Sequence, residues 1–377
     1  MNTIYLDHAA TTPVDNRILT KILPYFTEHY GNADSPHGVG RKAMNAVDEA
    51  RDALASAWGV KSNEVYFTSG GTESDNWAIV GGARAAKEQG KDHVIVSAIE
   101  HHAALAAANA LQKEGFTITF LPVNEGGRVE LNALQAALTD RTGLVAVMAV
   151  NNETGAVQPI RELAEIAHTR GAIFFTDCVQ AAPYMRIDPK AWGVDMLSVS
   201  AHKMYGMKGC GALYVRSGVK VKGLIVGGEQ ERGLRGGTTN VPAVVGFGEA
   251  YRLTLAEMDG ANEKIKALRE LFLREIATIN GVTVNGEGLP AVLNLRVKGV
   301  SAVDMVYAMD LRGVCIAAGS ACASASIKPS HVLMAMGLTE TEARECVRIS
   351  FGKNNTEEEI RRAAAIFIET VEKLRKE

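Results

Sequence analysis

The chain has 377 residues, which is long enough for two domains. Because 47% of its residues are hydrophobic, each domain can have its own core. Its 40 basic and 43 acidic residues give a net charge of −3 without long single-sign blocks, which argues against nucleic acid or a membrane surface as the main partner. Residues 1–13 lack the basic start and apolar core of a signal peptide, and no apolar run approaches the ~20 residues of a membrane span. We therefore expect a cytoplasmic protein with a small substrate.

Short apolar segments alternate with longer helical stretches from about residue 60 to residue 225, which is typical of a mostly parallel sheet covered by helices on both faces. In such sheets, ligands bind beyond the carboxyl ends of the strands. Thr72, His101, Asn152, Asp177 and Lys203 each follow one predicted strand, so we expect their side chains to meet at one edge. The predicted strands are Glu64–Thr68, His93–Ser97, Gly143–Val150, Ala172–Thr176, Asp195–Ser200 and Gly211–Arg216.

The turn after the first predicted strand, Ser69–Asp75, contains two adjacent glycines. Glycines let the backbone approach an anion, and the start of the following helix presents unpaired N–H groups, so this turn is a candidate phosphate site. A capping box between Thr72 and Asp75 explains the same residues equally well, and the two interpretations are compatible.

Lys203 is the most informative residue, because it closely follows the apolar run 195–199 and stands beside a histidine. Such an amine can be held close to neutrality and can form a Schiff base with a carbonyl cofactor. On its own, a lysine after a strand is more often an ordinary surface residue. Asp177, at the carboxyl end of the preceding strand, favours the cofactor: pyridoxal phosphate (PLP) needs a lysine for its aldehyde and an acidic residue to keep its ring nitrogen protonated.

Beyond the sheet, residues Pro242 to Ile279 carry few helix breakers apart from Gly246, Gly248 and Gly260, and predict long helices leading out of a large domain. Helices and strands then alternate again as far as the C-terminus. Residues 317–326 are all small and have little to pack against, which predicts a mobile loop.

The five cysteines, at positions 178, 210, 315, 322 and 346, form an odd set without a Cys-x-x-Cys pair. This spacing argues against a disulfide framework and against a structural zinc site. We expect reduced thiols, no bound metal, and at least one thiol available for chemistry.

Together these motifs resemble the cysteine desulfurases of the NifS/IscS type, which are PLP enzymes of fold type I in the class V aminotransferase group. The resemblance implies a large domain, residues 14–260, with a mostly parallel seven-stranded sheet between helices. It also implies a smaller α+β domain formed by residues 1–13 and 261–377. The motifs are Tyr5–Pro13, Phe67–Ser74, Glu100–His102, Val150–Gly155, Thr176–Gln180, Ser200–Lys203, Gly319–Cys322 and Val347–Ser350.

The resemblance implies a role for each cavity residue. Lys203 binds the cofactor aldehyde and later moves the substrate α-proton. His101 is a catalytic residue that stacks on the cofactor ring and moves protons near neutral pH, although a lone histidine is more often structural. Asp177 pairs with the ring nitrogen and Gln180 with the ring hydroxyl. Asn152 contacts both cofactor and substrate.

The cofactor phosphate is held, by the same resemblance, by Gly71, Thr72, Ser200 and His202. Thr238 matches a residue that reaches the phosphate from the neighbouring subunit. The resemblance therefore implies a homodimer with a site that is incomplete in one chain alone.

Arg348 and Cys322 match the residues that bind and attack the substrate. An arginine fork binds an amino acid carboxylate in bidentate fashion, whereas an isolated arginine is more often a surface charge. A thiolate is a strong nucleophile, whereas a cysteine among alanines can equally be a packing residue. Cys315 lies in a strand-like apolar run, so we expect its thiol to be buried, with a raised pKa.

We therefore expect conversion of L-cysteine to L-alanine with a persulfide on Cys322. The sulfur then passes to an acceptor protein, such as an iron–sulfur scaffold, for cluster, thio-cofactor or tRNA biosynthesis. Three alternatives stay open: a selenocysteine lyase, a small-substrate class V aminotransferase, and a non-catalytic interaction protein. The last is favoured only by Phe175 and Met207, where the family usually has histidine and proline.

Overall fold

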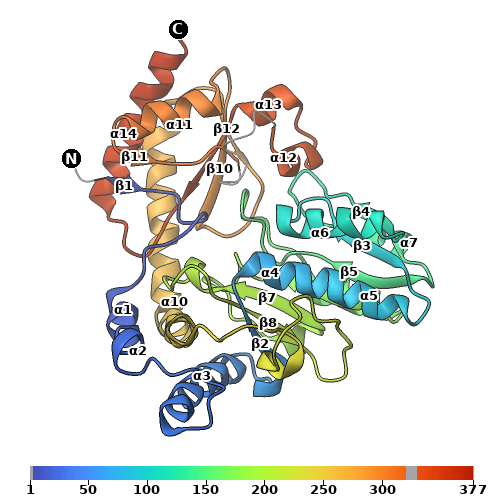
Figure 1. The fold of residues 1–377 in the computed structure, drawn as a ribbon. Helices are drawn as coiled ribbons and strands as arrows, with labels where there is room; N and C mark the ends of the chain where they lie inside the picture. Colours follow the sequence, from blue (N-terminus) through green and yellow to red (C-terminus); the bar gives the residue numbers. More distant parts are fainter. Residues whose placement is uncertain (1–2, 320–328, 377) are drawn as a thin grey trace.

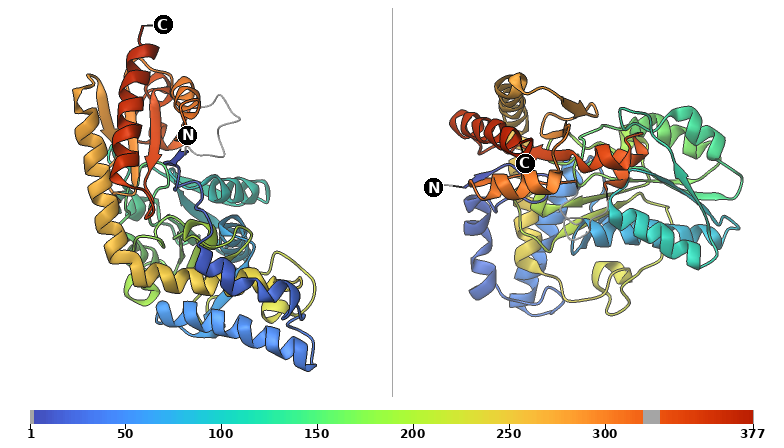
Figure 2. Two further views of the ribbon diagram at one scale, coloured as in Figure 1. Left: turned by 90° about the vertical axis from the view of Figure 1, so that its left-hand side faces the viewer. Right: turned by 90° about the horizontal axis from the view of Figure 1, so that it is seen from above.

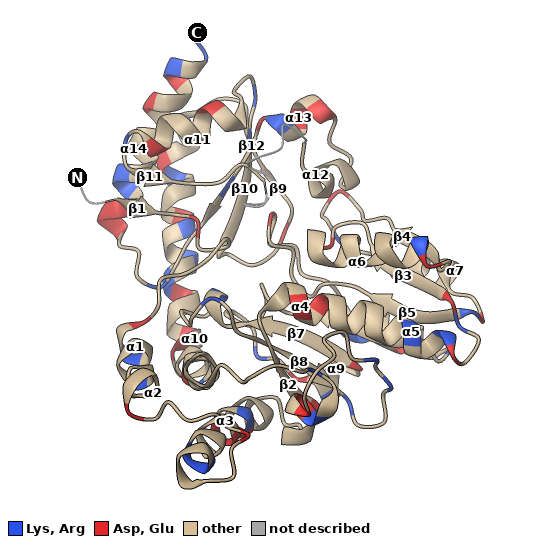
Figure 3. Cartoon of the chain, viewed as in Figure 1, with Lys and Arg blue, Asp and Glu red and all other residues tan. Residues whose placement is uncertain are grey.

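The computed structural model describes residues 3–319 and 329–376, so the predicted nucleophile Cys322 lies outside the described residues. The chain forms a larger part on one wide sheet and a smaller part on a second sheet (Figure 1). Basic and acidic residues are intermixed over both parts, as the nearly balanced composition implies (Figure 3). Within the described ranges, no helix is both long and apolar enough to cross a membrane.

Among the described residues, the larger sheet has seven strands in the order β2-β8-β7-β6-β5-β3-β4, and β8 runs antiparallel to its neighbours. The mostly parallel sheet expected from the sequence is confirmed. The edge strand β4 was not predicted, because its alternating threonine and apolar residues form no continuous apolar run. The strands are β2 (Val65–Thr68), β3 (His93–Ser97), β4 (Thr117–Leu121), β5 (Thr142–Ala146), β6 (Ile173–Asp177), β7 (Met196–Ser200) and β8 (Gly211–Val215).

Helices cover both faces of this sheet, with α4, α5 and α6 on one face and α3, α8 and α10 on the other (Figure 1). In α8, buried side chains recur at helical spacing, at Ile160, Leu163, Ala164 and Ala167. The helical segments that precede α10 are α1 (Asn16–Ile22), α2 (Pro24–Thr27), α3 (Gly38–Ala57), η1 (Ser62–Glu64), α4 (Gly71–Asn76), η2 (Trp77–Gly81), α5 (Gly82–Lys87), α6 (His102–Lys113), α7 (Leu131–Ala137), α8 (Ile160–His168), α9 (Pro189–Trp192), η3 (Ala201–Lys203) and η4 (Gln230–Gly233).

The helix α10 (Val241–Glu275) connects the two parts and runs beside both of them (Figure 2). It is one continuous helix of 35 residues, about 52 Å long, where the sequence predicted several long helices. Two of its glycines, Gly246 and Gly248, mark close packing rather than helix ends. A Cβ atom on Gly246 would lie 3.0 Å from Ile22 of α1, and one on Gly248 would lie 2.9 Å from Ala50 of α3.

The smaller part is built on an antiparallel sheet of order β12-β10-β9 and a parallel pair, β1 with β11. Ile4 and Leu6 from the N-terminus pack in its core with Ile265 and later residues. The predicted boundary at residue 260 falls inside α10, so the division into domains stays a prediction. The elements are β1 (Ile4–Tyr5), η5 (Ile276–Thr278), β9 (Val282–Asn285), β10 (Val292–Val297), α11 (Ala302–Asp310), β11 (Val314–Cys315), α12 (His331–Ala335), α13 (Glu340–Arg344), β12 (Cys346–Ser350) and α14 (Glu357–Leu374).

Gly248→Ala should lower the denaturant midpoint of unfolding, because the new methyl group would lie 2.9 Å from Ala50. Overpacking costs about 1–3 kcal/mol, which exceeds the ~1 kcal/mol that alanine gains over glycine in a helix. The matched control is Gly260→Ala in the same helix, where a Cβ atom would meet nothing within 4 Å. That variant should raise the midpoint. A rise in both variants would contradict the close packing of α10 on α3.

Candidate active site

A cavity of about 460 Å³ opens beyond the carboxyl ends of the parallel strands. Its lining comes from the segments that follow β2, β3, β5, β6 and β7, as the topology requires. The structure thus brings most of the predicted site residues to one place. The lining residues are Gly71, Thr72, Asp75, His101, Met148, Asn152, Asp177, Val179, Gln180, His202 and Lys203.

Lys203 follows β7 at the end of η3, and the N-terminal segment of the chain packs directly against it. Its Nζ donates hydrogen bonds to the carbonyls of residues 9 and 10, the latter at 3.1 Å. The Thr12 hydroxyl donates to the carbonyl of His202 at 2.7 Å and accepts from the N–H of Tyr205 at 2.8 Å. The segment 9–12 therefore holds the lysine turn, a contact that sequence patterns did not predict.

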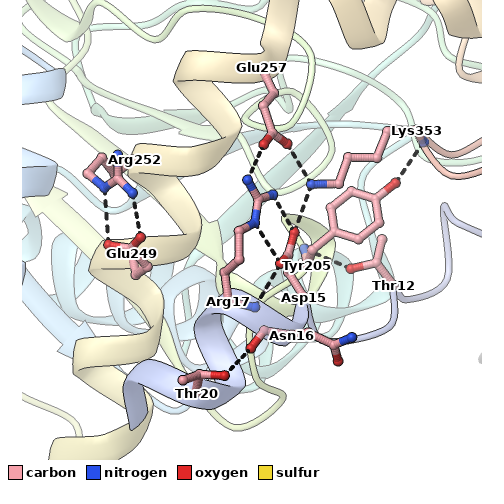
Figure 4. A network of polar contacts seen from close by, with 10 residues as sticks. All are labelled: Thr12, Asp15, Asn16, Arg17, Thr20, Tyr205, Glu249, Arg252, Glu257 and Lys353. Atoms are coloured by element: carbon pink, nitrogen blue, oxygen red, sulfur yellow. Dashed lines mark hydrogen bonds and ion pairs between the residues drawn. The ribbon is translucent and has the colours of Figure 1, made fainter.

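A network of ion pairs ties this turn to the smaller part of the molecule (Figure 4). Tyr205 adopts a left-handed backbone conformation, φ 60°, and its hydroxyl accepts from the N–H of Lys353 at 2.9 Å. The Nζ of Lys353 lies 4.4 Å from the Tyr205 ring centroid and pairs with Asp15 at 3.1 Å and Glu257 at 2.8 Å. Arg17 pairs with the same two carboxylates, each at 2.6 Å. The network joins the N-terminal segment, α10 and the chain that follows β12.

Asp177 ends β6 and is almost completely buried beside the cavity. Its Oδ1 accepts a hydrogen bond from the N–H of Val179 at 2.7 Å. Burial raises the pKa of Asp177 to about 6, against the lowering effects of the Val179 N–H and the positive charge of Lys203. Nearby, the Oε1 atom of Gln180 is buried without a hydrogen-bond partner. A buried, unpaired amide oxygen is costly, so a donor placed in the cavity would bind to it.

His101 precedes α6 and caps its N-terminus, because its Nδ1 accepts a hydrogen bond from the N–H of Ala103 at 3.2 Å. Burial, and then the positive charge of Lys203, lower the pKa of His101 to about 4. The imidazole is therefore neutral near pH 7, with its proton on Nε2. The same two causes lower the pKa of His202 to about 4.

The turn after β2 requires its two glycines. Gly70 has φ 151°, a conformation that other residues rarely adopt, and a Cβ atom on Gly71 would lie 2.8 Å from the side chain of Val179. Helix α4 begins at Gly71 without a side-chain cap. The capping box between Thr72 and Asp75 is therefore wrong, because the Asp75 carboxyl bonds to a neighbouring strand instead.

Arg348 is fully buried in β12 of the smaller part and lies outside the cavity lining. Its Nη2 pairs with Asp7 at 2.7 Å, and its Nη1 donates to the carbonyl of Asn152 at 3.1 Å. Its Nε is buried without a partner. Because Asn152 lines the cavity, the guanidinium lies directly behind that wall. Its pairing with Asp7 was not predicted.

The described cysteines are poor candidates for a reactive thiolate. Cys178, Cys210 and Cys346 are buried, and burial raises the pKa of each, to about 12 for the latter two. Cys315 lies in β11 and is half-buried rather than buried as predicted, and burial raises its pKa as well. Cys322, which is outside the described residues, is the remaining cysteine of the sequence.

Two predicted phosphate ligands lie outside the cavity lining. Ser200 is buried next to the glycine turn, with its Oγ 3.8 Å from the position of a Cβ atom on Gly70. Thr238 is exposed and lines a different hollow, together with Ser69 and Arg235. The chain by itself does not bring Thr238 to the cavity.

The two departures from the family pattern also lie away from the cavity lining. Phe175 is fully buried in the apolar core between the sheet and the helices α4 to α6. Met207 is half-buried against the core on the other face of the sheet. Both residues therefore act through packing, and neither removes a group from the cavity.

Residues 4–363 match the family model described as aminotransferase class V. The chain belongs to this family. It is 44% identical over 363 residues to the cysteine desulfurase IscS of Clostridium botulinum, across 95% of this chain and 91% of that protein. It is 45% identical over 381 residues to the putative cysteine desulfurase IscS 1 of Bacillus subtilis, across 99% and 100% of the two chains. A NifS-like protein of known structure matches with a TM-score of 0.93 and 33% identity, across 99% and 100% of the two chains. The resemblance inferred from the motifs is confirmed.

Lys353→Met should destabilise the protein by about 1–2 kcal/mol, because it removes two ion pairs and a cation–π contact from a partly buried network. The unfolding midpoint measures the loss. The matched control is Arg361→Met on α14, whose ion pair with Glu275 is largely exposed and should contribute less than about 0.5 kcal/mol. Equal shifts in the two variants would contradict the role given to the Lys353 network.

Proposed function

We propose that this protein is a PLP-dependent cysteine desulfurase that converts L-cysteine to L-alanine and retains the sulfur as a persulfide. The observation that carries the proposal is that Lys203 and Asp177 meet at one cavity from neighbouring strands. An amine that can bond to an aldehyde and a buried carboxyl that can hold a ring nitrogen protonated are what PLP requires. Relatives named cysteine desulfurases, at 44% and 45% identity, support cysteine as the substrate.

The described residues fit PLP in polarity. The cavity lining carries polar groups for a pyridine ring and for a phosphate arm. The unpaired Oε1 of Gln180 would accept a hydrogen bond from the ring hydroxyl. Asp177 would pair with the ring nitrogen, and the neutral imidazole of His101 would lie against the ring. Asn152 would contact both the cofactor and the substrate.

The phosphate would be held at the glycine turn. Gly71 allows close approach of the backbone at the start of α4, and Thr72 adds a hydroxyl. Ser200 and His202 would complete this side of the phosphate site. All four residues lie at the carboxyl ends of β2 and β7, strands that both border β8.

A second copy of the chain would complete the site from the other side. Leu19 on α1, Leu23 between the two helices and Phe26 on α2 are between 45% and 55% exposed, which is unusual for large apolar side chains so close together. We infer that this surface packs in a homodimer, in which the partner subunit's Thr238 reaches the phosphate.

When bound, PLP supplies an aldehyde for the substrate amine and a ring that delocalises the electrons released at the α-carbon. Lys203 would hold the cofactor and then remove the α-proton of cysteine. Arg348 would bind the substrate carboxylate. Asp7 and Asn152 occupy its two Nη atoms, and its buried Nε is the donor that has no partner.

Cys322 would take the sulfur. Its thiolate attacks the substrate sulfur, the carbon–sulfur bond of cysteine breaks, an S–S bond to Cys322 forms, and the carbon left behind takes up a proton. The sum is L-cysteine plus a thiol giving L-alanine plus a persulfide, so no outside oxidant is needed. The raised pKa values of the four described cysteines support Cys322 over its rivals.

The sulfur would then pass to an acceptor protein. An iron–sulfur scaffold is one such acceptor, and the IscS names of the relatives agree with it. Enzymes of thio-cofactor or tRNA biosynthesis are others. The cytoplasmic location expected from the sequence stays a prediction.

Purified protein loaded with PLP should convert L-cysteine to equal amounts of L-alanine and, with a thiol reductant, sulfide. Cys322→Ser should still bind PLP and cysteine, because the cavity lining and Arg348 are unchanged, but should release less than about 1% of the parental sulfide. The matched control Cys315→Ser should keep most of its activity, since that thiol is half-buried with a raised pKa.

Mass spectrometry after brief exposure to cysteine should place the extra sulfur on the peptide that contains Cys322. Extra sulfur on Cys315 would contradict the assignment of the nucleophile. Amino transfer to a keto acid without sulfide release would identify an aminotransferase instead. A strong preference for selenocysteine would identify a selenocysteine lyase.

A further inference from the structure

Three buried carboxyl groups lie close together at the cavity wall and behind it, and the proposed function uses one of them. Asp75 in α4 is 1% exposed, Glu100 before α6 is 0% exposed, and Asp177 at the end of β6 is 4% exposed. Electrostatic interactions link Asp75 to both of the others. The positive charge of Lys203 acts on Asp177. Three negative charges in a buried site are costly, so at least one carboxyl holds a proton.

Glu100, whose pKa is raised by burial to about 8, also holds a proton near pH 7, and Asp75 is the carboxyl best placed to hold one beside Asp177. The Oδ1 of Asp75 lies 2.6 Å from the Ser198 hydroxyl oxygen, at hydrogen-bond distance. Ser198 lies opposite Asp177 in the pairing of β6 with β7. Because the Ser198 hydroxyl has one proton, it can donate to Asp177 only when Asp75 supplies the proton of the bond between Asp75 and Ser198. Ser198 therefore stands between the two carboxyls. Burial, and then the charges of Asp177 and Glu100, raise the pKa of Asp75 far above its ordinary value.

Asp75 has no role in capping or stabilising the end of helix α4. The helix starts at Gly71 and has no side-chain cap, and Asp75 turns away from the helix end toward β7. Asp75 also lines the cavity, next to the place proposed for the cofactor ring. A buried acid that forms part of a cavity wall without capping a helix is expected to serve the site.

Glu100 differs from Asp75 in its contacts. Its Oε1 accepts from the hydroxyl of Ser97 at 2.5 Å and from the N–H of Met148 at 2.6 Å, and its Oε2 is buried without a partner. Burial raises the pKa of Glu100 to about 8. These contacts hold the segment between β3 and α6 and do not include Ser198, so Glu100 serves as a matched control.

We propose that Asp75 is a positioning residue for Asp177: it keeps a proton in the working protein and donates it to the Ser198 oxygen, so that the Ser198 hydroxyl donates to the Asp177 carboxylate and orients it toward the cofactor's ring nitrogen. This rests on the proposed function, because it assigns Asp177 to that nitrogen. A neutral Asp75 allows Asp177 to stay ionised and to keep its pairing with a protonated ring. An ionised Asp75 would drive the proton onto Asp177 and remove that pairing.

The first test needs no cofactor, so its result does not depend on the proposed function. Infrared difference spectra of the cofactor-free protein at pH 7 should show that Asp75→Asn loses the carbonyl band of a protonated carboxyl group. The loss of a carboxylate band instead would overturn the proposal, because Asp75 would then be ionised.

The second test uses the protein loaded with PLP and follows the pH titration of the bound cofactor's visible absorbance. Asp75→Asn keeps an uncharged donor for Ser198, because the amide N–H can replace the carboxyl proton, so the midpoint should stay parental and the apparent Kd for PLP should change by less than about threefold. Asp75→Leu removes that donor and should move the midpoint by about half a pH unit or more. Ser198→Ala breaks the same link from the other side and should behave like Asp75→Leu.

Glu100→Gln retains its oxygen acceptor and should leave the midpoint parental. Asp177→Asn shows how far the titration midpoint moves when the charge beside the ring nitrogen is lost. A midpoint in Asp75→Asn shifted as far as in Asp177→Asn would overturn the proposal. A parental midpoint in both Asp75→Leu and Ser198→Ala would overturn it as well, because the link to Asp177 would then have no effect.

Discussion

The parallel pairing of β6 with β7 is the constraint on which the candidate site depends. In this register Asp177 lies opposite Ser198, and Lys203 follows shortly after β7 ends. A slip of one residue would turn Asp177 to the other face of the sheet, where Phe174 packs in an apolar core. Helices cover both faces, so a displaced carboxyl would find no water there. The same packing that fixes the register therefore places the acid and the amine at one cavity.

The larger sheet and much of the site could be predicted, because both follow from local patterns. Strands buried on both faces appear as continuous apolar runs, and parallel strands bring their carboxyl ends to one edge. His101, Asn152, Asp177 and Lys203 each follow such a run, and all four line the cavity. The edge strand β4 was missed because both of its faces are partly exposed and its threonines interrupt the apolar run.

The contacts that could not be predicted join residues far apart in the chain. Arg348 pairs with Asp7 across 341 positions, and Thr12 holds the Lys203 turn across about 190 positions. No spacing in the sequence reports such pairs. At Asp75 the local sequence and the tertiary structure disagree. Its position three residues after Thr72 predicts a capping box, but its carboxyl is buried and bonds to Ser198 of β7 instead. Close packing likewise, rather than helix ends, explains Gly246 and Gly248 of α10.

The most direct measurement of the central claim is to identify the lysine that binds the cofactor. Cofactor-free protein would be loaded with PLP, reduced with borohydride, digested and analysed by mass spectrometry. The account predicts an adduct on Lys203 and none on Lys208, an exposed lysine five positions further along the chain. Lys203→Ala should lose both the adduct and the visible absorbance of bound PLP. An adduct on another lysine, or normal absorbance in Lys203→Ala, would contradict the account.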